Sequence, residues 1–252
     1  MNITFISFCD KEINNNVVNK MDFRGIIIGV GILIILLILA VRFRRVIILA
    51  LIRMIYGKFS YEFFHNYKKY FVRSPYQYCF RDEFTTHLLF IVSKNEEMPS
   101  FKTKKEIYFE NTPYFINYKD FLKKKGNPYC FNAFAFNQPD FVIKALGYQA
   151  TIAGSKAILV FYFMNDSFFM GEYIFKNPKN DIKASLTAHF LEVKDLSGNN
   201  FYIENTKDQI IHYQNTGFTV DIKYLNKENK AIIENLKQYY IKVTGKKLVM
   251  EA

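Results

Sequence analysis

The chain has 252 residues, three cysteines and a net charge of +11 at neutral pH. A chain of this length can bury a hydrophobic core without disulfides or metals. Its odd number of widely spaced cysteines indicates neither a disulfide framework nor a CxxC zinc site, and low cysteine content fits a reducing compartment. Residues 42–73 carry a net charge of +7 and residues 74–252 only +4. This distribution favours a lipid surface and argues against nucleic acid as the partner.

Gly25–Val41 is the strongest pattern in the chain, because its seventeen residues include no charged or polar side chain. About 17–25 apolar residues are enough for a helix to cross a bilayer. A buried core helix would carry a polar stripe, and a cleaved signal peptide would end in small residues rather than in Arg42-Phe43-Arg44-Arg45. We therefore predict one transmembrane helix preceded by a short tail, residues 1–24, for which Met21 is an alternative start.

A basic flank follows the predicted span. Basic residues next to a span are retained on the cytoplasmic side, so we expect the N-terminus outside and the C-terminal domain in the cytoplasm. The same side chains are suited to anionic headgroups of the bilayer. The flank consists of Arg42, Arg44, Arg45, Arg53, Lys58, Lys68 and Lys69.

Two further features belong to the anchor region. Gly25 and Gly29 form a GxxxG pair, which lets two helices approach closely and indicates a possible homodimer contact. Val46–Tyr56 is apolar but too short to span a bilayer, so it either continues the helix or lies along the interface. Together with a helix expected over Phe59–Tyr70, it makes residues 42–73 a juxtamembrane helical stalk.

The remaining residues, 74–252, are expected to form one cytoplasmic domain. Its first half gives weak signals: a strand over Thr86–Val92, a loop over residues 94–105, and a short strand over Glu106–Phe109. Asn117–Lys125 is expected to be a helix with Asn117 as its N-cap and Gly126 as its end.

The second half gives a clear alternation of strands and helices. Ala157–Phe163 is a continuous apolar run typical of a strand buried on both faces, and a turn leads back into Phe168–Lys176. Helices are expected over Asp181–Leu191 and Lys227–Val243. Further strands are expected over Tyr202–Glu204, Gln209–Gln214 and Phe218–Leu225. Because the strands are joined as hairpins, we predict an α+β domain with an antiparallel sheet and helices packed on one face.

Few residues indicate chemistry. No glycine-rich phosphate loop is present, and we expect no cofactor and no metal. Cys79, Glu83 and His87 follow each other at spacings of four, which would align a thiol, a carboxylate and an imidazole on one helix face. Pro75 and the β-branched run after His87 weigh against a helix there.

Glu172 stands out because it shares a strand face with Met170 and Ile174. An acid among apolar neighbours would have a raised pKa, which is typical of functional sites. The alternative is an edge strand, where a carboxylate prevents pairing with another chain. Gly171 beside it indicates a bulge or a close approach of the backbone.

Two hypotheses of function remain. In the first, the chain is a membrane-anchored interaction or scaffold module for an unknown protein partner. In the second, it is a membrane-bound hydrolase or transferase that acts near the lipid surface through Glu172, Asp166 or the Cys79–His87 group. An enzyme should bring at least two of these groups together in one pocket, whereas a binding module should present an apolar patch or an open sheet edge.

Overall fold

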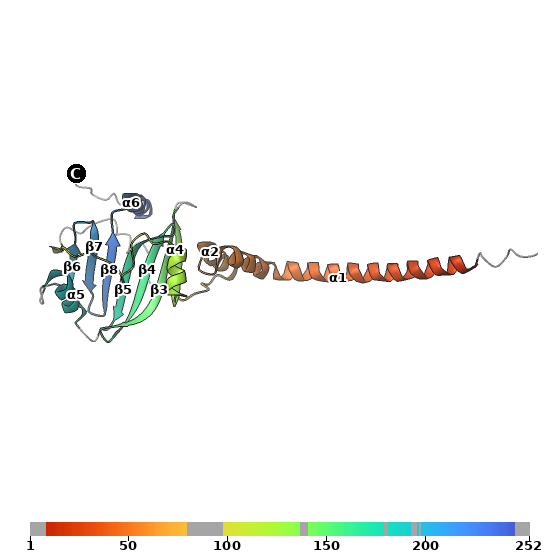
Figure 1. Cartoon of the computed structure of the whole chain (residues 1–252), viewed down its shortest axis with the longest axis horizontal. Helices are drawn as coiled ribbons and strands as arrows, with labels where there is room; N and C mark the ends of the chain where they lie inside the picture. The colour runs from red at the N-terminus through yellow and green to blue at the C-terminus, as the bar shows by residue number, and fades with distance from the viewer. Residues whose placement is uncertain are drawn as a thin grey trace, which may run out of the picture. The chain divides into compact units, whose positions relative to one another are not determined.

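A computed structural model describes residues 9–79, 98–136, 141–178, 181–192, 196 and 198–244. Contacts between Cα atoms divide the chain into two compact units, Met1–Ile55 and Tyr56–Ala252. The first unit is built on the long helix α1, and the second holds the sheet and the other helices (Figure 1). Glu83, His87 and the strand expected over Thr86–Val92 lie outside the described residues.

The helix α1 (Cys9–Tyr56) contains the predicted span. From Gly25 to Tyr56 it is apolar and long enough to cross a membrane. Large side chains of the predicted span are exposed, as at Ile28, which is 63% exposed. The helix continues without interruption through the arginines to Tyr56, so Val46–Tyr56 extends it. It ends where Gly57 adopts a positive φ of 88°, a conformation that favours glycine.

A second helix, α2 (Tyr61–Phe71), follows a short turn. Ser60 caps it, because its Oγ accepts a hydrogen bond from the N–H of Phe63 at 3.1 Å. The ring of Phe64 packs edge-on against Phe131 of the sheet, with 5.6 Å between ring centroids. The stalk helix expected over Phe59–Tyr70 therefore forms, and it packs on the sheet.

The sheet has eight strands in the order β1-β6-β7-β8-β5-β4-β3-β2. All neighbouring strands pair antiparallel except β1 and β6, which are parallel. The predicted α+β class with a mainly antiparallel sheet is confirmed. The strands are β1 (Ser100–Lys102), β2 (Cys130–Phe136), β3 (Phe141–Ile152), β4 (Ser155–Met164), β5 (Ser167–Lys176), β6 (Asn200–Glu204), β7 (Gln209–Asn215) and β8 (Thr219–Asn226).

The helices cover both faces of this sheet, so the prediction that they pack on one face was wrong. Buried side chains of α2, α4 (Tyr118–Lys125) and α5 (Ile182–Leu191) join one apolar cluster. Ile232, Leu236 and Tyr240 of α6 (Lys230–Thr244) join a second cluster on the opposite face. The physical reason lies in the strands: β4 is apolar at both odd and even positions, so each of its faces needs a cover.

On the α2 face, the irregular segment from Thr103 to Asn117 lies over the centre of the sheet. Phe109 is fully buried there, with its ring 4.8 Å from that of Phe161. A Cβ on Gly171 would lie 2.1 Å from the Phe109 ring, so this glycine makes room for the phenylalanine. The close approach expected at Gly171 is therefore made by a side chain. The short strand expected over Glu106–Phe109 is wrong, because only a bridge between Phe109 and Thr112 forms.

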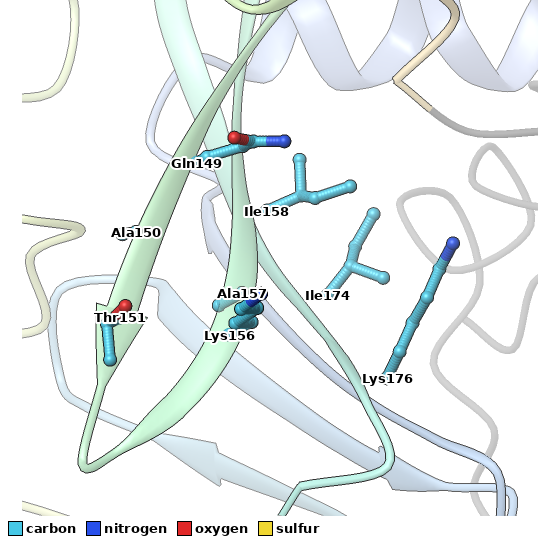
Figure 2. A pocket seen from close by; sticks show the side chains of 8 residues that line it. All are labelled: Gln149, Ala150, Thr151, Lys156, Ala157, Ile158, Ile174 and Lys176. Carbon is cyan, nitrogen blue, oxygen red and sulfur yellow. The ribbon is translucent and has the colours of Figure 1, made fainter.

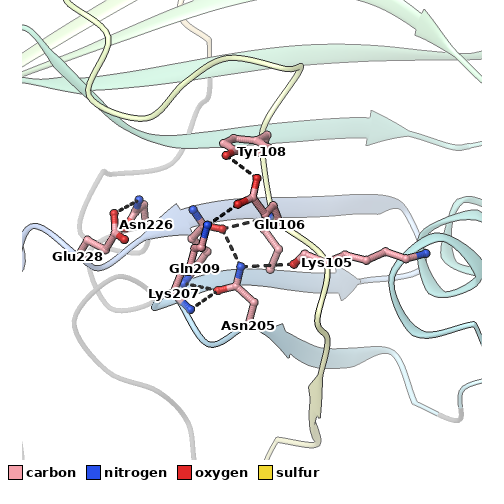
Figure 3. A network of polar contacts seen from close by, with 9 residues as sticks. Lys105, Glu106, Tyr108, Asn205, Lys207, Gln209, Asn226 and Glu228 are labelled. Carbon is pink, nitrogen blue, oxygen red and sulfur yellow. Dashed lines mark hydrogen bonds and ion pairs between the residues drawn. The ribbon is translucent and has the colours of Figure 1, made fainter.

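A polar network ties this segment to the turn between β6 and β7 (Figure 3). Gln209 accepts hydrogen bonds from the N–H of Ile107 at 3.1 Å and from Asn205 Nδ2 at 2.7 Å. Glu106 forms an ion pair with Lys207 and accepts a hydrogen bond from Tyr108. These contacts replace strand pairing and hold the segment against the sheet.

Candidate functional site

A row of polar side chains crosses the middle of the sheet on the face that α6 covers. The strand register places Tyr202, His212, Lys223 and Glu172 directly opposite one another on β6, β7, β8 and β5. Each of them is less than a tenth exposed. Since most buried strand positions are apolar, four neighbouring residues with polar groups on one face of the sheet are unusual.

Glu172 is the centre of this row. Its Oε1 lies 3.3 Å from Lys223 Nζ, and its Oε2 accepts a hydrogen bond from the Tyr162 hydroxyl at 2.6 Å. The carboxylate is 1% exposed and the lysine side chain 8%. In such surroundings a carboxylate needs both a counter-ion and hydrogen-bond donors, and Glu172 has both.

An irregularity in the pairing of β4 with β5 brings the tyrosine to the glutamate. Phe163 pairs with Phe168 and Tyr162 pairs with Met170, so Phe169 is an extra residue in β5. Such a bulge shifts the following residues to the other face of the sheet. The bulge expected near Gly171 is thus two residues earlier in the strand.

The electrostatics of the row follow from burial. Burial and the neighbouring Glu172 carboxylate raise the pKa of Tyr162 well above its usual value, so the phenol stays protonated and donates. Burial, assisted by the positive charge of Lys223, lowers the pKa of His212 from 6.5 to about 3, while Glu172 acts in the opposite direction. His212 is therefore neutral at physiological pH, and its ring stacks on Tyr202 with 4.9 Å between centroids.

The position of β5 overturns one interpretation of Glu172. The strand lies between β4 and β8 and is not an edge strand, so protection of an edge is wrong. The register confirms that Glu172 shares its face with Met170 and Ile174. A raised pKa for Glu172 stays a prediction. With 1% of the residue exposed, the carboxylate is enclosed by protein and joins β5 to β8 and β4 through Lys223 and Tyr162.

Asp166 lies elsewhere, in the turn between β4 and β5. Asn165 and Asp166 both have positive φ, 46° and 68°, as a two-residue hairpin turn requires. The Asp166 carboxylate forms an ion pair with Lys144 at 2.5 Å, and its backbone oxygen accepts the N–H of Tyr118 at 2.7 Å. These contacts give the residue a structural role in the hairpin.

Cys79 forms a disulfide with Cys130 at the start of β2. The prediction that the cysteines form no disulfide was therefore wrong, because 51 residues separate two side chains that the fold brings together. A Cβ on Gly147 would lie 2.1 Å from Cys130 Sγ and 2.9 Å from Cys79 Sγ, so the adjacent strand leaves space for the sulfur atoms. A bonded Cys79 has no thiolate to offer, and its expected companions Glu83 and His87 lie outside the described residues.

One open cavity of about 580 Å³ lies on β3, β4 and β5, at the end of the sheet where β3 turns into β4. Figure 2 shows Gln149 and Thr151 on β3, Lys156 on β4 and Lys176 on β5. Neither Glu172, Asp166 nor Cys79 is among the residues that line it. These are Gln149, Ala150, Thr151, Lys156, Ala157, Ile158, Ile174 and Lys176.

The candidate residues thus do not converge. Across the described part of the chain, no group of three or more His, Cys, Asp or Glu side chains could hold a metal ion. Sequence reasoning missed Lys223 and Tyr162, the two partners of Glu172. Lys223 gave no signal like that of Glu172, because it alternates with apolar residues in β8 together with Asp221, as charges on a solvent-facing strand do.

The basic flank lies on the helices. Arg42, Arg44, Arg45 and Arg53 are exposed on α1, and Lys68 and Lys69 are exposed in the last turn of α2. Lys58, between the helices, is half-buried, with its ammonium 4.8 Å from the centre of the Phe59 ring.

Comparison with known proteins gives no assignment: no protein-family model, no curated protein and no solved structure matches this chain.

Proposed function

We propose that this protein is a membrane-anchored interaction or scaffold module. Residues 25–41 span the bilayer, residues 1–24 form an external tail, residues 42–73 are a juxtamembrane segment, and residues 74–252 form a cytoplasmic domain that binds a protein partner. The basic flank rests on anionic headgroups of the bilayer. Gly25 and Gly29, which have open space beside their Cα atoms, are a contact for a second copy.

The observation that carries this proposal is the separation of the catalytic candidates. Glu172 is enclosed with Lys223 and Tyr162 in the middle of the sheet, whereas Asp166 is paired with Lys144 in the turn between β4 and β5. An enzyme needs at least two such groups around one substrate site. The enzyme hypothesis is therefore the weaker of the two. A folded domain attached to an apolar helix is suited to binding a protein partner at the membrane.

Partner binding can be tested on the full chain extracted from its own membrane in mild detergent. We expect a protein to co-purify in fixed stoichiometry with the full chain and to be absent from residues 1–56 expressed alone as the matched control. A turnover activity that disappears in both Glu172→Gln and Asp166→Asn, with no partner retained, would overturn the proposal in favour of the enzyme.

The orientation needs a separate experiment, since Cys79 and Cys130 do not react with thiol reagents while they are bonded to each other. Phe218, 80% exposed in the turn before β8, offers a better position. We expect an impermeant maleimide added to intact cells to label Cys9 and to leave Phe218→Cys unlabelled until the membrane is opened. Labelling of Phe218→Cys in intact cells would place the domain outside, in a compartment where the disulfide is stable.

A further inference from the structure

The end of α2 exposes apolar side chains in an unusual conformation. Val72, the C-cap residue, is 93% exposed, and Phe71 before it is 39% exposed. Val72 has φ 57° and ψ 14°, which is left-handed backbone, and its N–H donates to the Lys68 oxygen at 2.8 Å. Helices commonly end on such a residue, but glycine or asparagine usually fills the position. A β-branched residue there is rare, and here its side chain points to solvent.

Positive charge surrounds this tip. Lys68 and Lys69 occupy the last turn of α2, Arg73 follows Val72, and all three are exposed. The acidic residue of α2, Glu62, is in its first turn, at the other end of the helix. Phe71 continues the face of α2 that buries Phe63 and Phe64, with its ring 4.8 Å from that of Tyr67, so the tip lies past the end of the buried face. An exposed apolar tip in a basic surround fits the boundary between headgroups and acyl chains of an anionic bilayer.

We propose that Phe71 and Val72 form an interfacial wedge that inserts into an anionic lipid surface, with Lys68, Lys69 and Arg73 on the headgroups. This inference rests on the proposed function, because the transmembrane helix keeps the wedge close to the bilayer. Two observations select lipid as the occupant: the charge is complementary to anionic headgroups, and only four residues separate the end of α1 from the start of α2. The wedge would give the domain a second attachment to the bilayer besides the transmembrane helix, and so fix its orientation on the membrane surface.

The test uses the full chain in vesicles and a fluorescent probe that responds to polarity. Cys9 is replaced by serine, and the probe is attached to Val72→Cys under non-reducing conditions, which keep the Cys79–Cys130 bond. Phe218→Cys with the same probe is the matched control, since Phe218 is also strongly exposed but lies on the β7–β8 turn. Vesicles contain phosphatidylcholine with or without phosphatidylserine, and part of the lipid carries brominated acyl chains that quench a probe on contact.

We expect the probe at residue 72 to shift to shorter wavelength and to lose most of its emission in brominated vesicles that contain phosphatidylserine. The probe at residue 218 should be unaffected. Replacing Lys68, Lys69 and Arg73 together by glutamine should abolish quenching at residue 72. Near-ultraviolet circular dichroism of the tyrosines checks that each variant is folded.

Equal emission at residues 72 and 218 in both kinds of vesicle would overturn the wedge. Quenching that is the same without phosphatidylserine, or that survives the triple glutamine variant, would overturn the role of the basic side chains. If the emission of the probe at residue 72 shifts to shorter wavelength in native membranes but not in vesicles, the tip binds a protein and the lipid proposal fails. A chain that does not float with vesicles contradicts the anchor itself, whereas a chain that floats without quenching contradicts the wedge alone.

Discussion

Two lysine–carboxylate pairs belong to the same sheet but lie in very different surroundings. In the middle of the sheet, Glu172 and Lys223 are 1% and 8% exposed, whereas at the β4–β5 turn Asp166 and Lys144 are 39% and 12% exposed. The exposed pair has the shorter N–O distance, 2.5 Å against 3.3 Å. Distance alone would rank it as the stronger contact. Because water screens charges at a surface and not in a core, we expect the opposite order when either pair is broken.

The largest effect is expected from Lys223→Met. The substitution leaves a buried carboxylate without its lysine, and breaking a buried ion pair in this way costs about 3–5 kcal/mol of the free energy of unfolding. Chemical unfolding of the full chain in micelles measures it. Near-ultraviolet circular dichroism is a suitable signal because all 18 tyrosines lie from Tyr56 onward, so α1 up to Ile55 contributes none of the tyrosine signal.

The matched control is the double variant Glu172→Gln with Lys223→Met. Removing both charges avoids the isolated carboxylate, so much of the lost stability should return. A loss below about 1 kcal/mol for Lys223→Met alone would mean that the buried pair behaves like a surface pair, and the comparison would fail.

Both pairs also show how far the sequence could lead. The β4–β5 hairpin, its turn at Asp166 and the cap Asn117 follow from local rules, and the structure has them. Glu172 could be identified from the sequence because a charged residue within an apolar strand is visible in that segment alone. Its partner Lys223 is 51 positions away on β8, and only the register of β5 with β8 brings them together. Strand order is a property of the whole fold and cannot be read from one segment.

The other errors have the same origin. β2 and β3 were missed because CFNAFAF and the long strand after it show no clear alternation of apolar with polar residues. The disulfide depends on the packing of the segment that holds Cys79 against β2, and the position of α6 depends on how the whole sheet is assembled. Local patterns thus predicted the fold class, while the site depended on contacts between distant segments.

A middle-sized effect is expected from the pH dependence of the buried row. The pKa of His212 falls from 6.5 in the unfolded chain to about 3 in the folded chain. Below about pH 6.5 the unfolded chain therefore binds a proton at this histidine that the folded chain does not bind. The stability linked to neutral His212 is complete above about pH 6.5 and is lost progressively as pH falls towards 3, by at most about 1.4 kcal/mol for each pH unit.

Unfolding curves between pH 7 and pH 4 for the native chain and for His212→Gln measure this slope. The native chain should lose stability faster than the variant as pH falls. His65→Gln is the matched control, because His65 is exposed on α2 and lies outside the buried row. Parallel curves for the native chain and His212→Gln would show that the histidine accepts its proton in the folded sheet. In that case the middle of the sheet would be more accessible to water than its burial indicates.

The smallest effect is expected from Asp166→Asn at the exposed pair. Asparagine tolerates the left-handed backbone of this turn as well as aspartate does, so the substitution removes the charge and keeps the hairpin. Loss of a partly exposed ion pair should lower the free energy of unfolding by about 0.2–1 kcal/mol, and added salt should shrink the difference between variant and native chain. Unfolding in low and high salt, read through the same tyrosine signal, checks both points. A loss as large as that of Lys223→Met would mean that the short Lys144–Asp166 contact is shielded from water when the chain is on its membrane. The two pairs would then contribute similarly to the free energy of unfolding despite their different places in the sheet.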